Sequence, residues 1–168
     1  MTHTSVPGLE AAAARQVTAQ LAQRLPGLID LQLTLKHVHW NVTGMSFIAV
    51  HEMLDEHVDE VRLMTDAVAE RIAILGGEPV GTPGHVVKER TWDDYPVSRA
   101  DVVTHLRKLD EVYDGVISDH RAAVAEVGEL DPVSEDLLIG QTAKLELQQW
   151  FIRSHIEHAG GTGDGTGA

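Results

Sequence analysis

Residues 35–77 read LKHVHWNVTGMSFIAVHEMLDEHVDEVRLMTDAVAERIAILGG and carry the clearest helical pattern in the chain. Side chains suited to a core, all apolar but one, recur at alternating steps of four and three residues: Leu54, Val58, Val61, Thr65, Val68, Ile72 and Leu75. Such a repeat places one stripe along a helix, and the pair Gly76 and Gly77 is a typical helix end. The stretch therefore predicts a long amphipathic helix that packs by one face.

Two pairs of metal-ligating side chains lie on this helix at a spacing of four residues, His51 with Asp55 and Asp66 with Glu70. Side chains four residues apart project from the same helix face, as two ligands of one ion must. The eleven residues from Asp55 to Asp66 span roughly 16 Å, so the two pairs cannot share an ion within one chain. Either the chain holds two separate sites, or a second subunit supplies one of the pairs.

The phase of these ligands relative to the apolar stripe favours the second alternative. They lie roughly 60° to 160° round the helix from the stripe, and His39 of the preceding helix can reach the same flank. A flank with imidazoles at one end and carboxylates at the other is self-complementary about a two-fold axis between antiparallel copies. Two nitrogen and three oxygen ligands suit Fe(II), with Mn(II) or Zn(II) able to compete. The shared site would draw three ligands from one subunit and two from its partner: His39, His51 and Asp55, then Asp66 and Glu70.

A histidine and a carboxylate four residues apart on an exposed helix usually form only a weak surface pair. Asp101 and His105 have this spacing and no further ligand in phase, so we expect them to be such a pair. The pairs that begin at His51 and Asp66 differ, because they share a flank with each other and with His39. This agreement in phase is the reason for predicting a metal site.

Three further stretches carry helical periodicity and none shows the alternation of a strand, which predicts an all-α fold. The first helix of the chain is expected to begin near residues 8–11. It contains Pro26, which should kink the helix or split it. A capping box formed by Ser98 and Asp101 is expected to begin the third helix. The fourth should begin at a cap followed by a first-turn proline, Asp131 and Pro132.

The connection over residues 78–97 is rich in Gly, Pro and charge, with room for a short extra helix over residues 83–88. Its length lets the second and third helices run parallel. Four helices connected in this way suggest a ferritin-like four-helix bundle. The kind of di-iron site found in a bundle core has no support, because no Asp or Glu is followed three residues later by His.

Composition narrows the possible functions. The 168 residues, 43% of them hydrophobic, suit one well-cored domain, which we assign to residues 9–159 between a short tail, 1–8, and a flexible Gly-rich tail, 160–168. The lack of cysteine excludes disulfides, thiolate chemistry and cysteine-based metal sites. A net charge of −13 argues against a generally basic, nucleic-acid-binding surface. No apolar run approaches the roughly 18 residues of a membrane span, so we expect a soluble cytoplasmic protein.

The quoted stretch resembles the signature region of the Dps family, the mini-ferritins or DNA-binding proteins from starved cells. The HW pair, the F-x-x-x-HEM-x-D block and the D-x-x-x-ER block stand at the family's spacing, and TWDDYPV and QWFIRSHIE extend the likeness. The resemblance implies a hollow homododecamer of ferritin-like bundles with ferroxidase sites at two-fold interfaces, where the five residues named above occupy the ligand positions. It also implies oxidation of Fe(II), preferably by hydrogen peroxide, storage of Fe(III) in the cavity and protection against oxidative damage.

The resemblance implies roles for two further groups of residues. Trp40 matches a tryptophan that lies close to the iron site in the family and takes up stray oxidising equivalents, with core or interface packing as the alternative. An acidic cluster near the start of the last helix matches the three-fold pores through which iron enters, although acidic residues are common in a first helical turn for dipole reasons. Its members are Glu129, Asp131, Glu135 and Asp136.

The chain departs from the family in its potential to bind DNA. Members that bind DNA often do so through Lys- and Arg-rich tails, whereas residues 1–15 contain a single Arg and residues 160–168 contain no basic residue. Polyanion binding needs such cations to neutralise phosphates, so direct DNA binding is doubtful. We therefore expect a peroxide-consuming ferroxidase and iron store. The alternatives are a nucleoid-associated DNA-compacting protein and a metal-buffering cage without redox turnover.

Overall fold

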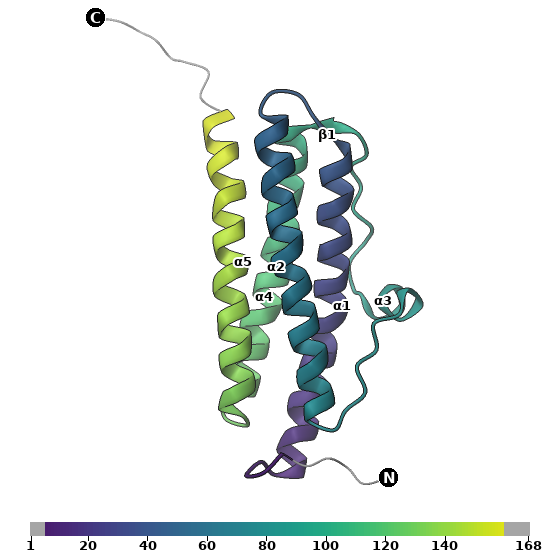
Figure 1. The fold of residues 1–168 in the computed structure, drawn as a ribbon, viewed down its shortest axis with the longest axis vertical. Coiled ribbons are helices and arrows are strands. Elements are labelled where there is room, and N and C mark those ends of the chain that lie inside the picture. Colours follow the sequence, from purple (N-terminus) through teal and green to yellow (C-terminus); the bar gives the residue numbers. More distant parts are fainter. Residues whose placement is uncertain (1–5, 160–168) are drawn as a thin grey trace, which may run out of the picture.

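The computed structural model describes residues 6–159, so the expected tail at 160–168 and most of the tail at 1–8 lie outside the described residues. Four long helices form a bundle and a short helix lies beside it (Figure 1). The long helices are α1 (Ala11–Asn41), α2 (Phe47–Ile74), α4 (Val102–Val127) and α5 (Pro132–Ala159). The short elements are β1 (Val42–Thr43), α3 (Pro83–Glu89) and β2 (Ala100–Asp101).

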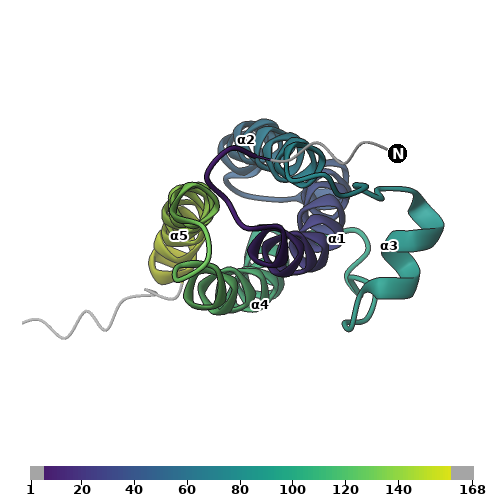
Figure 2. The ribbon, with the colours of Figure 1, turned by 90° about the horizontal axis from the view of Figure 1, so that it is seen from below.

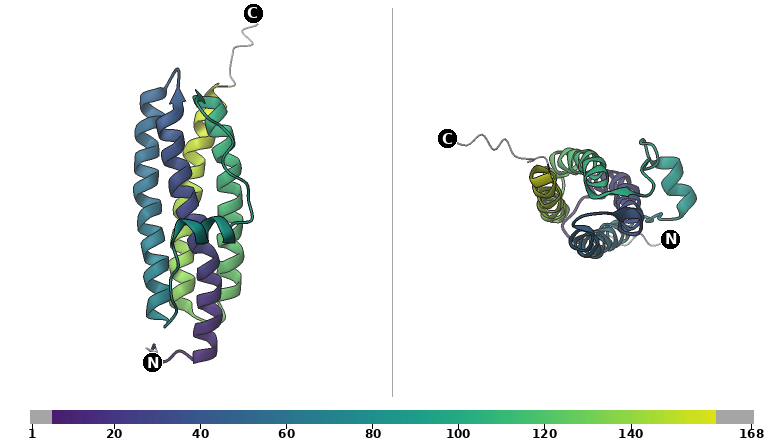
Figure 3. Two further views of the ribbon diagram at one scale, coloured as in Figure 1. Left: turned by 90° about the vertical axis from the view of Figure 1, so that its right-hand side faces the viewer. Right: turned by 90° about the horizontal axis from the view of Figure 1, so that it is seen from above.

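The long helices pair as two antiparallel hairpins, α1 with α2 and α4 with α5 (Figure 1, Figure 2). The connection between α2 and α4 returns the chain along the bundle, so these two helices run parallel. Within this connection, α3 lies against the outer side of α1, away from α5 (Figure 3). A parallel pairing of Val42 with Ala100 joins the turn after α1 to the start of α4. The expected all-α bundle with a short extra helix is confirmed.

The apolar stripes predicted from the sequence form the core. The largest fully buried side chains come from all four long helices: Leu21, Leu28, Leu31, Leu35, Leu54, Ile72, Leu106, Leu109, Tyr113, Leu138, Leu145 and Ile152. Burial of each such side chain contributes roughly 1.5–3 kcal/mol, so packing between the helices stabilises the bundle more than local helix propensity does. None of the described helices is long and apolar enough to cross a membrane.

One expectation about Pro26 is narrowed and one about a helix cap is wrong. Helix α1 continues through Pro26 without splitting, with the buried Leu25 and Leu28 packed in the core on either side of it, so a kink at Pro26 stays a prediction. Helix α4 is capped by Asp101 rather than by Ser98, and the Asp101 carboxylate accepts hydrogen bonds from the Thr104 amide at 3.1 Å and hydroxyl at 2.7 Å. The pairing of β2 with β1 explains the second difference, because it keeps the backbone extended up to the cap.

His105 is also placed differently from the expectation. It is fully buried, with its Nδ1 atom 3.0 Å from the hydroxyl oxygen of Tyr95, and it does not form a surface pair with Asp101. Tyr95 lies in the connection between α2 and α4, and its hydroxyl also donates to the His105 carbonyl at 3.2 Å. The buried histidine therefore attaches this connection to α4.

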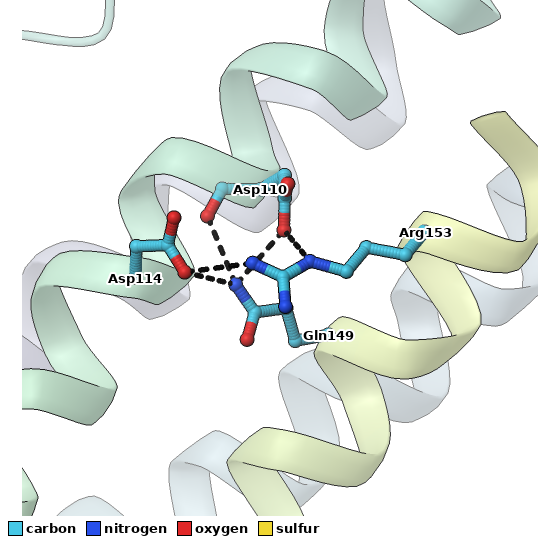
Figure 4. Close-up of polar contacts among 4 residues, drawn as sticks. All are labelled: Asp110, Asp114, Gln149 and Arg153. Carbon is cyan, nitrogen blue, oxygen red and sulfur yellow. Dashed lines mark hydrogen bonds and ion pairs between the residues drawn. The ribbon is translucent and has the colours of Figure 1, made fainter. Parts of the chain in front are cut away.

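A polar cluster joins α4 to α5 at the surface (Figure 4). Arg153 donates from Nε to Asp110 Oδ1 at 2.7 Å and from Nη2 to Asp114 Oδ1 at 2.8 Å. Gln149 donates from Nε2 to the same two carboxylate oxygens, at 2.8 and 2.7 Å. Each helix contributes two residues four apart, one turn of the helix, so the cluster fixes the register between α4 and α5.

Candidate metal centre

Three of the predicted ligands meet at one end of the bundle. His39 lies in the last turn of α1, and His51 and Asp55 lie in the first turns of α2. The short loop between the two helices brings the end of α1 beside the start of α2. One potential ligand atom from each of the three residues lies within 4.8 Å of the others. His39 is buried, His51 is half-buried, and the Asp55 side chain is 51% exposed. The cluster therefore has a closed histidine side and an open carboxylate side.

The two histidines orient each other through reciprocal hydrogen bonds. His39 Nδ1 lies 3.0 Å from the His51 carbonyl oxygen, and His51 Nδ1 lies 3.0 Å from the His39 carbonyl oxygen. The rings stack with their centroids 3.6 Å apart and their planes at 22°. A carbonyl oxygen can only accept, so each imidazole in its neutral form carries its proton on Nδ1 and leaves the Nε2 lone pair free. His39 Nδ1 also lies 3.3 Å from Asp55 Oδ1. Two imidazoles and a carboxylate with ligand atoms within 4.8 Å of one another form a donor set that fits a divalent transition-metal ion.

Lys36 also contacts this cluster, and the sequence reasoning missed it. Its ammonium group donates to Asp55 Oδ1 at 2.6 Å. This hydrogen bond is the main reason why the pKa of Asp55 lies below its usual range, and the charges of His39 and Lys36 act in the same direction. Asp55 is therefore a carboxylate at neutral pH and can bind a cation, although the ion must compete with the ammonium group. Lys36 and Asp55 lie on different helices, so no helical spacing could have revealed the contact.

The two other predicted ligands do not join the cluster within the chain. Asp66 and Glu70 are exposed, and they follow Asp55 by three and four turns on α2. Asp66 lines a shallow groove with Arg62 and Leu63 of the same helix. This separation agrees with the rise calculated from the sequence, so any site that uses all five residues needs a second chain.

Trp40 follows His39 directly but is 71% exposed. This exposure excludes packing in the core of the bundle as the role of its ring. A place at an interface, or a role beside a metal ion, is compatible with the exposure.

The four acidic residues near the start of α5 differ in their surroundings. Asp131 is buried, pairs with Arg71 Nη2 at 2.6 Å and accepts hydrogen bonds from the Val133 and Ser134 amides. It therefore acts as the cap of α5 and as a tie to α2. Of the other members of the cluster, Glu135 is half-buried, and Glu129 and Asp136 are exposed.

Replacing Asp131 with alanine is expected to lower the free energy of unfolding by about 3 kcal/mol, because Arg71 loses its buried partner. Burial acts to raise the pKa of Asp131, but hydrogen bonds from Ser134 and Arg71 outweigh it and lower the pKa below 3.8. The stabilisation is therefore complete above pH 3.8 and is lost as the pH falls through the lower, folded-state pKa. Thermal unfolding between pH 7 and pH 3 measures the effect. The exposed Asp136→Ala is the control, and equal unfolding temperatures for both variants would contradict the prediction.

Comparison with known proteins identifies the family. The sequence model of the ferritin-like domain family matches residues 18–160. The "DNA protection during starvation protein" of Mycolicibacterium smegmatis is 53% identical over 161 residues, which cover 96% of this chain and 88% of that protein. The "Fine tangled pili major subunit" of Haemophilus ducreyi is 50% identical, over 95% of this chain and 84% of that protein.

Solved structures agree with this result. Mycobacterium smegmatis Dps superposes with a TM-score of 0.92 and 51% identity, over 100% of this chain and 98% of that chain. DpsA14 from Streptomyces coelicolor superposes with a TM-score of 0.88 and 60% identity, over 90% of each chain. Similarity at this level over nearly the whole chain establishes common descent as well as a common fold. The chain belongs to the ferritin-like family and, within it, to the Dps proteins.

Proposed function

We propose that this protein is a ferroxidase and an iron store, with Fe(II) as the substrate of the histidine–carboxylate cluster. The observation that carries the proposal is the convergence of His39, His51 and Asp55, whose potential ligand atoms lie within 4.8 Å of one another while backbone carbonyls orient both imidazoles. These donors suit Fe(II), with Zn(II) and Mn(II) as competitors. Membership of the ferritin-like family supports iron as the physiological ion.

Three ligands are fewer than Fe(II) usually takes, and we propose that Asp66 and Glu70 of a second copy complete the site. Both carboxylates are exposed on the flank of α2 that carries His51 and Asp55. Large apolar side chains are also exposed on α1 and α2, among them Ile48 at 59% and Leu63 at 63%. Burying such side chains is a driving force for association. A two-fold axis then creates two equivalent sites per dimer, and the dimers assemble into a hollow homododecamer.

The proposed reaction transfers two electrons to hydrogen peroxide. Each of two Fe(II) ions gives up one electron, the O–O bond breaks, and two protons complete two water molecules. Because both electrons reach the peroxide, no hydroxyl radical is released. Trp40, exposed beside His39, is placed to give an electron to a stray one-electron oxidant. The Fe(III) product is stored as oxide inside the shell.

The test begins with anaerobic protein loaded with Fe(II), to which hydrogen peroxide is added. The proposal expects a rapid rise in Fe(III) absorbance, two Fe(II) consumed per peroxide and little spin-trapped hydroxyl radical. The particle mass in solution, measured on the same sample, should be that of twelve chains. Oxidation no faster than in protein-free buffer, or a monomeric particle, would contradict the proposal.

For iron entry we propose a pore near the start of α5, lined by acidic residues around a three-fold axis. Glu129 and Asp136 are exposed and can attract cations, and Glu135 lies beside them, half-buried. Asp131 anchors this region to α2 through its ion pair with Arg71. Its contribution to the pore is therefore to hold the start of α5 in place.

Replacing Lys36 with methionine is expected to lower the half-saturating Fe(II) concentration roughly two- to fivefold, the range of an exposed ion pair. In this variant, Fe(II) no longer has to displace the Lys36 ammonium group from Asp55. Anaerobic titration of both proteins with Fe(II) measures the change. Lys108→Met, which removes a lysine paired with Glu111 on α4, should leave the value unchanged. Weaker binding by the Lys36 variant would instead show that the lysine holds Asp55 in place for the metal.

Direct DNA binding is the second candidate, favoured by the name of the relative from Mycolicibacterium smegmatis. The net charge of −13 and the lack of basic residues at 160–168 argue against it. A gel-shift titration at physiological ionic strength should therefore show no complex. We place the protein in the cytoplasm, and a shifted band in that titration would favour the nucleoid instead.

A further inference from the structure

A cavity of about 630 Å³ lies between α1, α4 and the segment over residues 91–96. This volume is within the range of small-molecule sites in proteins. None of the five predicted metal ligands, nor Trp40, lines this cavity. Whatever binds here is therefore independent of the iron chemistry proposed above.

The segment over residues 91–96 forms a fixed outer wall of the cavity. The Trp92 indole donates to Asp30 Oδ2 at 2.7 Å, and Arg90 donates to Asp30 Oδ1 at 3.2 Å. The Tyr95 hydroxyl is tied to His105 of α4, as described above. These contacts attach the wall to α1 and to α4, so the cavity does not depend on a loosely held loop.

Gly115 of α4 leaves space on the helix side of the cavity. A Cβ atom built on this residue would meet no atom within 4 Å. Gly27 of α1 acts differently, because a Cβ atom there would meet the Trp92 ring at 3.6 Å and a larger side chain would push the wall away. Glycine is unfavourable inside a helix relative to alanine, and neither residue has a positive φ that would require it. The open space beside α4 is therefore what distinguishes Gly115.

Two carboxylates of α4 lie one turn before and one turn after Gly115. Glu111, Gly115 and Asp119 follow one another at steps of four residues, so they share one face of the helix, and all three line the cavity. Eight residues correspond to roughly 12 Å of helix rise, which separates the two carboxylates along the cavity. Val112 and Val116, both half-buried, line the cavity between them. This face of α4 thus offers a negative charge at each end of an apolar stretch.

These carboxylates are more accessible to a ligand than the cations that pair with them. Glu111 pairs with Lys108 at 2.6 Å, and Asp119 pairs with Arg24 at 2.9 Å. The side chains of the two acids are 67% and 54% exposed, against 35% for Lys108 and 12% for Arg24. A ligand that enters the cavity therefore meets carboxylate oxygens before it meets either cation.

The net charge of the lining also favours a cation. Arg24 and Lys108 are the cationic side chains of the lining, and Arg90 adds a third positive charge from outside it through ion pairs with two of the acids. An excess of two negative charges remains, which suits a ligand with two positive charges. The lining has five acids: Asp30, Asp93, Asp94, Glu111 and Asp119.

We propose that this cavity binds a linear aliphatic amine with an ammonium group at each end, the chemistry of diamines and polyamines. One ammonium group pairs with Glu111 and the other with Asp119. An ammonium group carries three donors, so it can share a carboxylate with the cation already paired there. The methylene chain lies over Gly115, against Val112 and Val116. A dication also balances the two excess negative charges.

Calorimetric titration of the assembled, full-length protein with diaminooctane tests the proposal. We expect one bound amine per chain. Aminooctanoate, which has the same length but a carboxylate in place of one ammonium group, should bind about tenfold more weakly, because it exchanges one ion pair for a repulsion. Diaminobutane is too short to reach both carboxylates and should also bind at least about tenfold more weakly, because it buries fewer methylene groups. Equal affinities for diaminooctane and aminooctanoate, or no heat with diaminooctane at millimolar concentration, would overturn the proposal.

A pair of variants separates this site from a general attraction of amines to an acidic protein. Glu111→Gln with Asp119→Asn should lower the affinity for diaminooctane about tenfold, the combined range of two exposed ion pairs. Glu56→Gln with Glu126→Gln is the matched control, because it removes two exposed carboxylates of α2 and α4 that do not line the cavity. The control should keep the wild-type affinity. An equal loss in both variants would show that only the overall charge attracts the amine, and would reject the site.

A variant that fills the cavity gives an independent test. Gly115→Leu should weaken diaminooctane binding at least about tenfold, since the leucine side chain occupies the space of the methylene chain. Gly140→Leu is its control, because a Cβ atom there also meets no atom within 4 Å and the residue lies on α5, away from the cavity. The particle mass and the helix content of each variant verify assembly and folding. Unchanged affinity in a correctly assembled Gly115→Leu would contradict the proposal.

Discussion

Replacing both His51 and Asp55 with alanine is expected to lower the rate of Fe(II) oxidation by hydrogen peroxide at least about a hundredfold. Loss of a group that merely orients a ligand already costs about 10–100-fold in metal affinity or activity. The double variant removes two of the three donors that the structure brings together. It also removes the ring that stacks on His39, which keeps only its hydrogen bond to the backbone carbonyl of residue 51. Stopped-flow absorbance of Fe(III) measures the rate.

The control for this experiment must remove the same kinds of side chain from outside the cluster. Glu56 is an exposed carboxylate directly after Asp55, and His85 is a partly exposed histidine on α3. Glu56→Ala with His85→Ala should keep the wild-type rate, since neither residue belongs to the cluster. Equal rates in the His51→Ala, Asp55→Ala variant and the wild type would remove the cluster from the mechanism.

The sequence predicted those parts of the fold that depend on neighbours along the chain. The apolar stripe of α2 and its glycine end follow from local periodicity, and the structure ends the helix at Ile74, with Gly76 at a φ of 83°. The cap at Asp131 was predicted for the same reason. The cap at Ser98 was wrong because the start of α4 depends on a partner 57 residues away, where Thr43 donates to the Ala100 carbonyl.

The candidate site shows the same division between local and long-range features. His51 and Asp55 share a helix, so their spacing predicted their common face, and His39 could be placed because one short turn separates it from them. The contact of Lys36 with Asp55 joins two helices and has no local signal in the sequence. Nor does any periodicity predict which histidines are buried, as the position of His105 against Tyr95 illustrates.

The second large effect concerns the origin of the last two ligands. His51→Ala alone and Asp66→Ala alone are each expected to lose most oxidation activity. Shells reassembled from an equal mixture of the two variants should recover about a quarter of the wild-type rate. In a mixed dimer, one site receives both defects, and the other receives intact histidines from one chain and an intact carboxylate pair from its partner. Half of the randomly formed dimers are mixed, and each carries one intact site of two.

A mixture of His51→Ala with His39→Ala provides the matched control for this recovery. Both defects then lie on the histidine side, so every site in every dimer lacks one imidazole and no recovery is expected. If instead all five ligands acted within one chain, each chain of either mixture would carry a defect, and both mixtures would stay inactive. Within the chain, Asp66 and Glu70 lie three and four turns beyond Asp55. Because this distance excludes an intrachain site with all five ligands, the proposed intersubunit site predicts recovery in the first mixture but not in the second.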